Sequence, residues 1–125
     1  MNVEDADRYL READPTLVTF LTEKIDSLLK WDVLQFFHNN PHAADTPAQI
    51  AHALGRDRES VAPALVSLAA ARLLRERAAS GAMVYMLTDD VQHRREIAAF
   101  IRACDDPRFR RSAILHVLQR ATATR

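Results

Sequence analysis

The short stretch from residue 46 to residue 49 constrains the fold of this chain more than any other part of the sequence. It consists of Thr-Pro-Ala-Gln, in which Thr46 can cap a helix, Pro47 can occupy the first turn and Gln49 can reach back to the cap. Such a capping box assigns a helix start to one position. The residues that follow predict a short helix that ends at Gly55.

A second helix is predicted directly after the first. Asp57 can cap it, because its carboxylate can accept hydrogen bonds from the free amides of the following turn. Val61, Leu65 and Leu68 then recur at helical spacing and form one apolar stripe. We expect this helix to reach about residue 71 and to meet the preceding helix across a tight turn.

A β-hairpin is predicted for residues 73–87. The segments 73–77 and 83–87 have the composition of short strands. The connection between them, residues 78–82, contains Gly81, which can adopt a positive φ.

Further helices are expected on both sides of this core. Asp14 and Pro15 mark the start of one long helix, which is kinked near residues 30–32 and ends at the His-Asn-Asn-Pro sequence of residues 38–41. After the hairpin, two apolar stripes predict two more helices, the second of which begins at Pro107. The predicted order is therefore helix, helix, helix, hairpin, helix, helix.

The composition excludes several classes of protein. The chain has 125 residues, 48% of them hydrophobic, with 17 basic and 17 acidic side chains, which fits one globular domain. Its one cysteine, Cys104, cannot form an internal disulfide or a cysteine-based zinc site. Two glycines argue against a glycine-rich phosphate loop, and no nucleophile is paired with a base in a known motif. We therefore expect no enzymatic activity, no cofactor and no metal ion.

The location of the protein is also constrained. The acidic start of the chain differs from a secretory signal. No apolar run approaches the ~18 residues of a membrane span. We expect a cytoplasmic protein that has no membrane partner.

The charges are distributed unevenly along the chain. Residues 1–55 carry nine acidic and four basic side chains, whereas residues 56–125 carry eight acidic and thirteen basic ones. The second part is therefore the candidate surface for a polyanion. All thirteen of its basic residues are arginines, which can form bidentate bonds with phosphate, although a solvated arginine-rich surface explains the same pattern.

The predicted elements have the order of a winged helix-turn-helix domain. Residues 46–61, with a capped helix, a Leu-Gly end and a second cap, resemble the pattern of bacterial MarR-type and ArsR-type transcriptional regulators. Residues 84–89 resemble the last wing strand of those families. The resemblance covers roughly residues 31–90. Two positions depart from it, because Arg72 stands where the families usually have glycine and Pro63 falls inside the second helix.

The resemblance implies a mainly α fold in which a three-helix core carries a β-hairpin wing. It suggests an N-terminal helical extension (1–30), a winged domain (31–90) and a C-terminal helical pair (91–125) through which a homodimer forms. It also implies that the helix of residues 58–71 enters the major groove of double-stranded DNA and that the wing lies beside the DNA backbone, as in a transcriptional regulator.

Seven residues are the candidate DNA contacts. Arg58 and Ser67 are expected to face bases, since arginine pairs well with guanine, and the other arginines are expected to contact phosphates. The residues carry basic or hydroxyl groups and lie around the second helix and the wing: Arg56, Arg58, Ser60, Ser67, Arg75, Arg77 and Ser80.

A second function stays open, in which the winged helix is a protein-protein interaction module that binds no DNA. The formal net charge is zero, and the helix side opposite the apolar stripe is mostly small and apolar. Exposed apolar surface of this kind often marks a contact with another protein. The residues on that side are Ala62, Pro63, Val66, Ser67 and Ala70.

Overall fold

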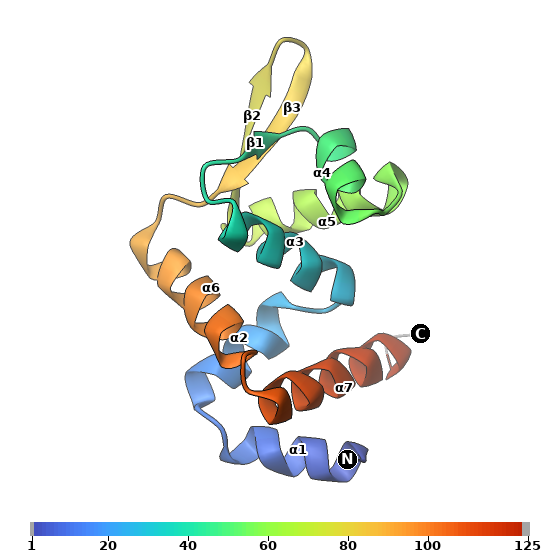
Figure 1. The fold of residues 1–125 in the computed structure, drawn as a ribbon, viewed down its shortest axis with the longest axis vertical. Coiled ribbons are helices and arrows are strands. Elements are labelled where there is room, and N and C mark those ends of the chain that lie inside the picture. The colour runs from blue at the N-terminus through green and yellow to red at the C-terminus, as the bar shows by residue number, and fades with distance from the viewer. Residues whose placement is uncertain (1, 124–125) are drawn as a thin grey trace. The chain divides into compact units, whose positions relative to one another are not determined.

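The computed structural model describes residues 2–123, which form seven helices and a small antiparallel sheet (Figure 1). Residues 29–97 form one compact unit, here called the winged unit, and the described segments on either side of it in the sequence form a second one, the terminal unit. The elements are α1 (Val3–Glu12), α2 (Pro15–Lys24), α3 (Leu28–Asn39), β1 (Ala44–Asp45), α4 (Pro47–Leu54), α5 (Arg58–Ala70), β2 (Leu74–Ala79), β3 (Ala82–Leu87), α6 (Val91–Ala103) and α7 (Pro107–Ala123).

The helices α4 and α5 begin at the predicted caps. The Thr46 hydroxyl accepts a hydrogen bond from the Gln49 amide, and the Gln49 side chain accepts one from the Thr46 amide. Asp57 accepts from the amide of Ser60 at the start of α5. Both predicted caps are confirmed. The helices α3, α4 and α5 then bury a common set of apolar side chains: Val33, Leu34, Phe37, Ile50, Val61, Leu65 and Leu68.

The sheet has the order β1-β3-β2, with β3 in the middle. β2 and β3 pair along their whole length, up to Ala79 opposite Ala82, so that only Ser80 and Gly81 remain in the turn. Their φ angles are 52° and 79°, and a two-residue type I′ turn requires positive φ at both positions. The predicted hairpin is confirmed. The predicted connection over residues 78–82 was too wide, because the small residues at its two ends pair as strands.

The order α3, β1, α4, α5, β2, β3 is that of a winged helix, with a three-helix core and a hairpin wing. In Figure 1 the hairpin projects away from the three helices of this unit. Helices precede the winged helix in the chain and two helices follow it. The predicted mainly α fold class is therefore confirmed.

The helices α4 and α5 end in the same way. One residue takes the left-handed conformation, and its amide donates a hydrogen bond to the carbonyl three positions earlier. The amide of the next residue donates to the carbonyl five positions before it. This pair of bonds is a Schellman motif. At the end of α4 the left-handed residue is Gly55, and at the end of α5 it is Arg72, both with φ of 66°. This conformation strains every residue that has a Cβ, so the turn before the wing is strained at Arg72.

The predicted long helix from Pro15 to Phe37 is wrong. The structure has two helices there, α2 and α3, which are separated at residues 25–27. Ile25 leaves the helical conformation with φ of −113° and ψ of 85°, and the Asp-Ser pair after it belongs to the residue types that form local hydrogen bonds in competition with a helix. Residues 30–32, where a kink was expected, lie inside α3.

The sequence did not predict α1. Asn2 caps this helix by accepting the Asp5 amide at 2.8 Å, and the helix packs along α7. Ala6 and Leu10 are the buried apolar residues of the part of α1 whose side chains are described. Val3, Ala6 and Leu10 recur at helical spacing, but this apolar stripe is short and was overlooked among the charged residues around it.

Aromatic rings form the centre of the terminal unit. Phe100 lies between Phe20 and Phe109, with ring centroids 5.5 Å and 6.1 Å away. Cys104 is buried in the same unit, and burial raises the pKa of its thiol to about 12. Within residues 2–123, no helix has both the length and the apolar character that crossing a bilayer requires.

Candidate nucleic-acid interface

The side of α5 that faces away from the core is open to solvent. Val61, Leu65 and Leu68 are buried, as the apolar stripe predicts. The opposite stripe, here called the outer flank, is made of four exposed residues at helical spacing. Its members are Glu59, Pro63, Val66 and Ala70, and the side chain of Val66 is 55% exposed.

The outer flank offers little for reading bases. Three of its residues are apolar, and the fourth, Glu59, carries a negative charge that repels phosphate. Glu59 lies in the first turn of α5, where the positive end of the helix dipole stabilises an acidic side chain. Pro63 lies inside α5, which continues to Ala70, although proline provides no amide for the Glu59 carbonyl.

The start of α5 contains two of the predicted contact residues. Arg58 is exposed, and no ion pair or hydrogen bond of its side chain is found within residues 2–123. The Ser60 hydroxyl instead donates to the Asp57 carboxylate at 2.9 Å. The bonds from Ser60 hold the pKa of Asp57 below its usual range. Ser60 therefore supports the helix cap, while Arg58 projects a guanidinium group into solvent.

Ser67 lies beside a cation that sequence reasoning missed. The Lys30 ammonium group, from α3, donates to the Ser67 hydroxyl oxygen at 2.7 Å. Ser67 is half-buried, and its hydroxyl still has a proton to donate. No local signal could have revealed this pair, because the two residues are 37 positions apart in the sequence.

Arg56, which precedes α5, is paired with an acid. Its Nη2 atom lies 2.7 Å from Oδ2 of Asp32 on α3. The two side chains are 44% and 46% exposed. An ion pair this exposed stabilises a fold by only ~0–1 kcal/mol, so another anion can replace Asp32 at low cost.

The hairpin carries the remaining contacts. Arg75 and Arg77 alternate with Glu76 along β2, so the two arginines lie on one face of the strand. Arg75 donates to the Leu87 carbonyl at 3.5 Å and lies 3.6 Å from the Asp89 carboxylate. Arg77 is exposed, and its guanidinium has no ion pair within the part of the chain that the structure describes.

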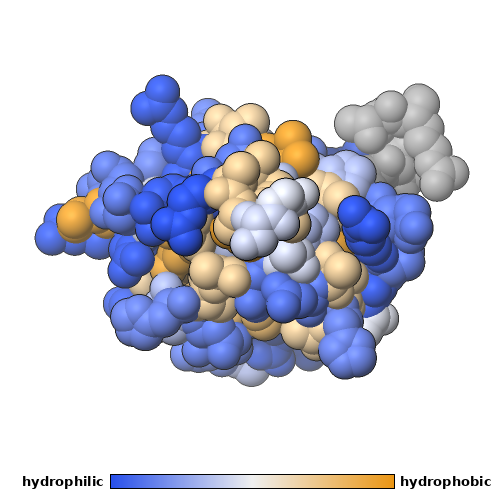
Figure 2. All heavy atoms as spheres, turned by 90° about the horizontal axis from the view of Figure 1, so that it is seen from above, coloured by the Kyte–Doolittle hydropathy of each residue, from blue (hydrophilic) through white to orange (hydrophobic). Residues whose placement is uncertain are grey.

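Ser80 lies in the hairpin turn and is exposed. Figure 2 looks at the molecule from above, which is the hairpin end in Figure 1. It shows weakly hydrophobic side chains gathered at the centre of the view, with hydrophilic side chains around them. Ala82 and Met83, the first two residues of β3, are exposed, so a small apolar surface follows the turn after the arginines of β2.

Among the described residues, no three His, Cys, Asp or Glu side chains are close enough together to hold a metal ion. The thiol of Cys104 is buried and its pKa is raised to about 12, which leaves it protonated at neutral pH and a poor nucleophile.

No family model matches this chain, and no curated protein matches its sequence. One similar solved structure is described as a "possible transcriptional regulator" from Methanosarcina mazei Go1. The two are 16% identical in sequence, and the match covers 86% of this chain and 82% of that chain with a TM-score of 0.45.

Proposed function

We propose that this chain is a non-enzymatic transcriptional regulator that binds double-stranded DNA through its winged helix and acts as a homodimer. The observation that carries the proposal is the solvent-exposed side of α5, with Arg58 at its start unpaired within residues 2–123 and two arginines on one face of the wing strand β2. A winged helix presents this helix to the major groove and the wing to the backbone.

The candidate residues have different roles in this proposal. Arg58 is the base-reading residue, because a guanidinium group can form two hydrogen bonds with guanine. Arg77 contacts phosphate directly, while Arg56 and Arg75 exchange Asp32 and Asp89 for phosphate oxygens. Those exchanges cost little, since each ion pair is solvent-exposed.

The hydroxyl-bearing residues have smaller roles. Ser67 and Ser80 donate to phosphate or base oxygens, and Ser60 contributes through the cap of α5. Lys30 joins the interface as an additional cation beside Ser67. Backbone contacts therefore supply most of the affinity, and sequence discrimination is modest.

We further propose that the parts of the chain have separate tasks. Residues 31–90 bind DNA, residues 1–30 form an N-terminal helical extension, and residues 91–125 hold the homodimer together. The exposure of Leu118 on α7, at 46%, supports a contact there, because Ile114 and Leu115, one turn before it, are only half-buried.

The test is a fluorescence anisotropy titration of a mixed-sequence DNA duplex at several salt concentrations. Affinity should fall steeply with salt, and Arg77→Ala should reduce the slope of log affinity against log salt by about one. Arg58→Ala, at the base-reading residue, should instead weaken duplex binding by ~1–3 kcal/mol and reduce the preference among sequences. Arg11→Ala, at an exposed arginine of α1, is the matched control and should leave the slope unchanged. Absence of duplex binding at low salt would refute the proposal.

The second candidate function, a protein-protein interaction module, is favoured by one observation. The outer flank of α5 exposes apolar side chains, with Val66 the most exposed large one on this helix. Under this alternative the chain binds no duplex at low salt. A protein complex containing the chain would then dissociate on Val66→Asp and persist on Arg77→Ala.

A further inference from the structure

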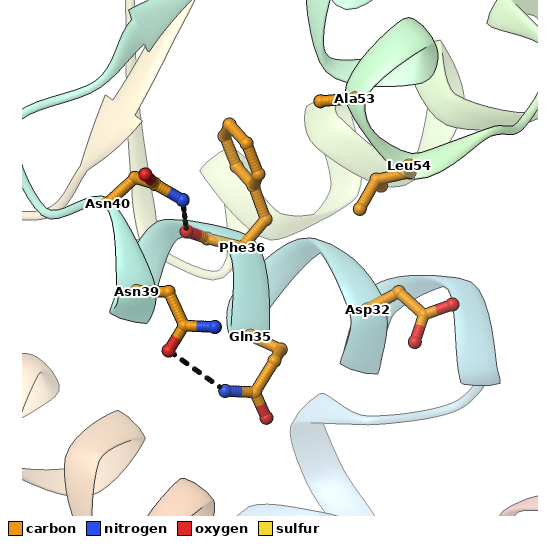
Figure 3. A pocket seen from close by; sticks show the side chains of 7 residues that line it. All are labelled: Asp32, Gln35, Phe36, Asn39, Asn40, Ala53 and Leu54. Carbon is orange, nitrogen blue, oxygen red and sulfur yellow. Dashed lines mark hydrogen bonds between the residues drawn. The ribbon is translucent and has the colours of Figure 1, made fainter.

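The winged unit contains an open groove between α3 and the end of α4, with a volume of about 390 Å³ (Figure 3). The residues from α3 follow one another at helical spacing, so they form one side of that helix. The other wall consists of Ala53 and Leu54. Figure 3 shows the Phe36 ring extending from α3 towards the level of these two residues.

The groove presents acceptors of hydrogen bonds. Asp32 carries the only charge among its lining residues. The Asn40 amide group donates to the Phe36 carbonyl at 2.9 Å, and the Gln35 amide group donates to Asn39 at 3.2 Å. These bonds use amide N–H groups, which leaves the oxygens of Gln35 and Asn40 as acceptors. The wall opposite is the C-terminal end of α4, which is the negative end of a helix dipole.

The carboxylate at one end of this groove already binds a cation. The guanidinium group of Arg56, which is not itself a lining residue, lies 2.7 Å from Asp32. Both side chains are nearly half exposed, so the pair is weak and open to competition. The groove therefore combines a carboxylate that binds a guanidinium group with a phenyl ring, whose face attracts cations and apolar groups.

We propose that this groove binds a small organic cation, with an ammonium or guanidinium head on Asp32 and an apolar or aromatic body against Phe36 and Leu54. The head takes the place of Arg56. The released Arg56 side chain then becomes available for a DNA phosphate, a step that rests on the proposed function. Because such coupling is reciprocal, the cation strengthens DNA binding and DNA strengthens cation binding.

The binding site itself is tested without DNA, by calorimetric titration of the full chain with benzylammonium. Benzyl alcohol and benzoate are the matched neutral and anionic probes. Benzylammonium should bind at millimolar concentration, more tightly than either. Asp32→Asn should weaken its binding, and Glu23→Gln, at an exposed acid of α2, should not. Equal binding of the cation and the alcohol, preference for benzoate, or no binding at all would overturn the proposal.

The competition with Arg56 gives an independent readout. Arg56→Gln should raise the affinity for benzylammonium about two- to fivefold, the factor that a surface ion pair is worth, because Asp32 is then unoccupied. Phe36→Leu should lower the affinity for benzylammonium, although an apolar side chain stays in place. A thermal unfolding transition checks that this variant is folded. If Arg56→Gln leaves the affinity unchanged or lowers it, the head does not bind where proposed.

The coupling to DNA is measured last, in the anisotropy titration. Saturating benzylammonium should raise duplex affinity about two- to fivefold, and the increase should disappear in Arg56→Gln. An increase that persists in that variant overturns the coupling. If the chain binds benzylammonium as expected but binds no duplex, the groove proposal stands and the proposed function fails.

Discussion

Replacing Arg72 by glycine should stabilise the winged unit. Arg72 has φ of 66°, in the turn that closes α5 before the wing. Gly55 has the same φ in the equivalent position after α4, so the molecule contains its own reference for this turn. The strain is confined to the backbone, because Arg72 is exposed and no ion pair of its guanidinium is found within residues 2–123.

The size of the effect follows from two opposing terms. A residue with a Cβ pays ~1–2 kcal/mol for the left-handed conformation. Glycine avoids this cost but gives the unfolded chain extra freedom, which costs ~0.4–1 kcal/mol. Arg72→Gly should therefore raise the free energy of unfolding by about 0.8 kcal/mol, which corresponds to about 3 °C in Tm for a chain of this length.

The assay is urea unfolding followed by the fluorescence of Trp31, the chain's single tryptophan, which is buried in α3 of the winged unit. The midpoint should rise for Arg72→Gly at an unchanged slope. Arg72→Ala, which removes the charge and keeps the Cβ, is the matched control and should leave the urea midpoint unchanged. Gly55→Ala should lower it, although a Cβ at residue 55 meets no atom within 4 Å. If Arg72→Ala stabilises as much as Arg72→Gly, the charge and not the backbone conformation is responsible.

Three further predictions concern single side chains. Glu59→Gln should strengthen duplex binding about two- to fivefold in the anisotropy titration, because it removes a like charge facing the phosphates; unchanged affinity would show that the outer flank does not approach DNA. The folded state lowers the pKa of Asp57, so its cap stabilises the fold above the unfolded-state pKa and this contribution is lost as the pH falls through the folded-state value. Asp57→Asn, which still caps the helix, should therefore make the free energy of unfolding fall less steeply at acid pH. The same fall as in the unmodified chain would contradict this. Cys104, with a pKa raised to about 12, should resist iodoacetamide at neutral pH in the native protein and react in urea, as mass spectrometry can show; rapid native labelling would mean that the thiol is accessible.

The features predicted correctly from the sequence are those determined by neighbouring residues. The capping box at Thr46, the cap at Asp57 and the left-handed Gly81 each depend on a few adjacent positions. At residue 72, where the resembled families usually have glycine, the turn forms with an arginine in the left-handed conformation.

Most of the features missed leave no mark in the apolar pattern. Apolar spacing continues through Ile25, so periodicity did not reveal the break between α2 and α3, where Ile25 leaves the helical conformation before the Asp-Ser pair. The pairs Lys30 with Ser67 and Arg56 with Asp32 join residues 37 and 24 positions apart. Neither pair has a signal in local sequence, and both change how the candidate interface works, since Arg56 is occupied and Lys30 adds a charge.

The interleaving of the two units along the chain has a consequence for synthesis on the ribosome. All of residues 29–97 lie between the two segments of the terminal unit, so every residue of the winged unit has been translated before α7 emerges. During that time α1 and α2 lack α7, the helix that packs against α1. Nascent chains in which residues up to 97 have left the ribosome and α7 has not should therefore carry a protease-resistant winged unit, while their N-terminal helices are still open to cleavage and to chaperones.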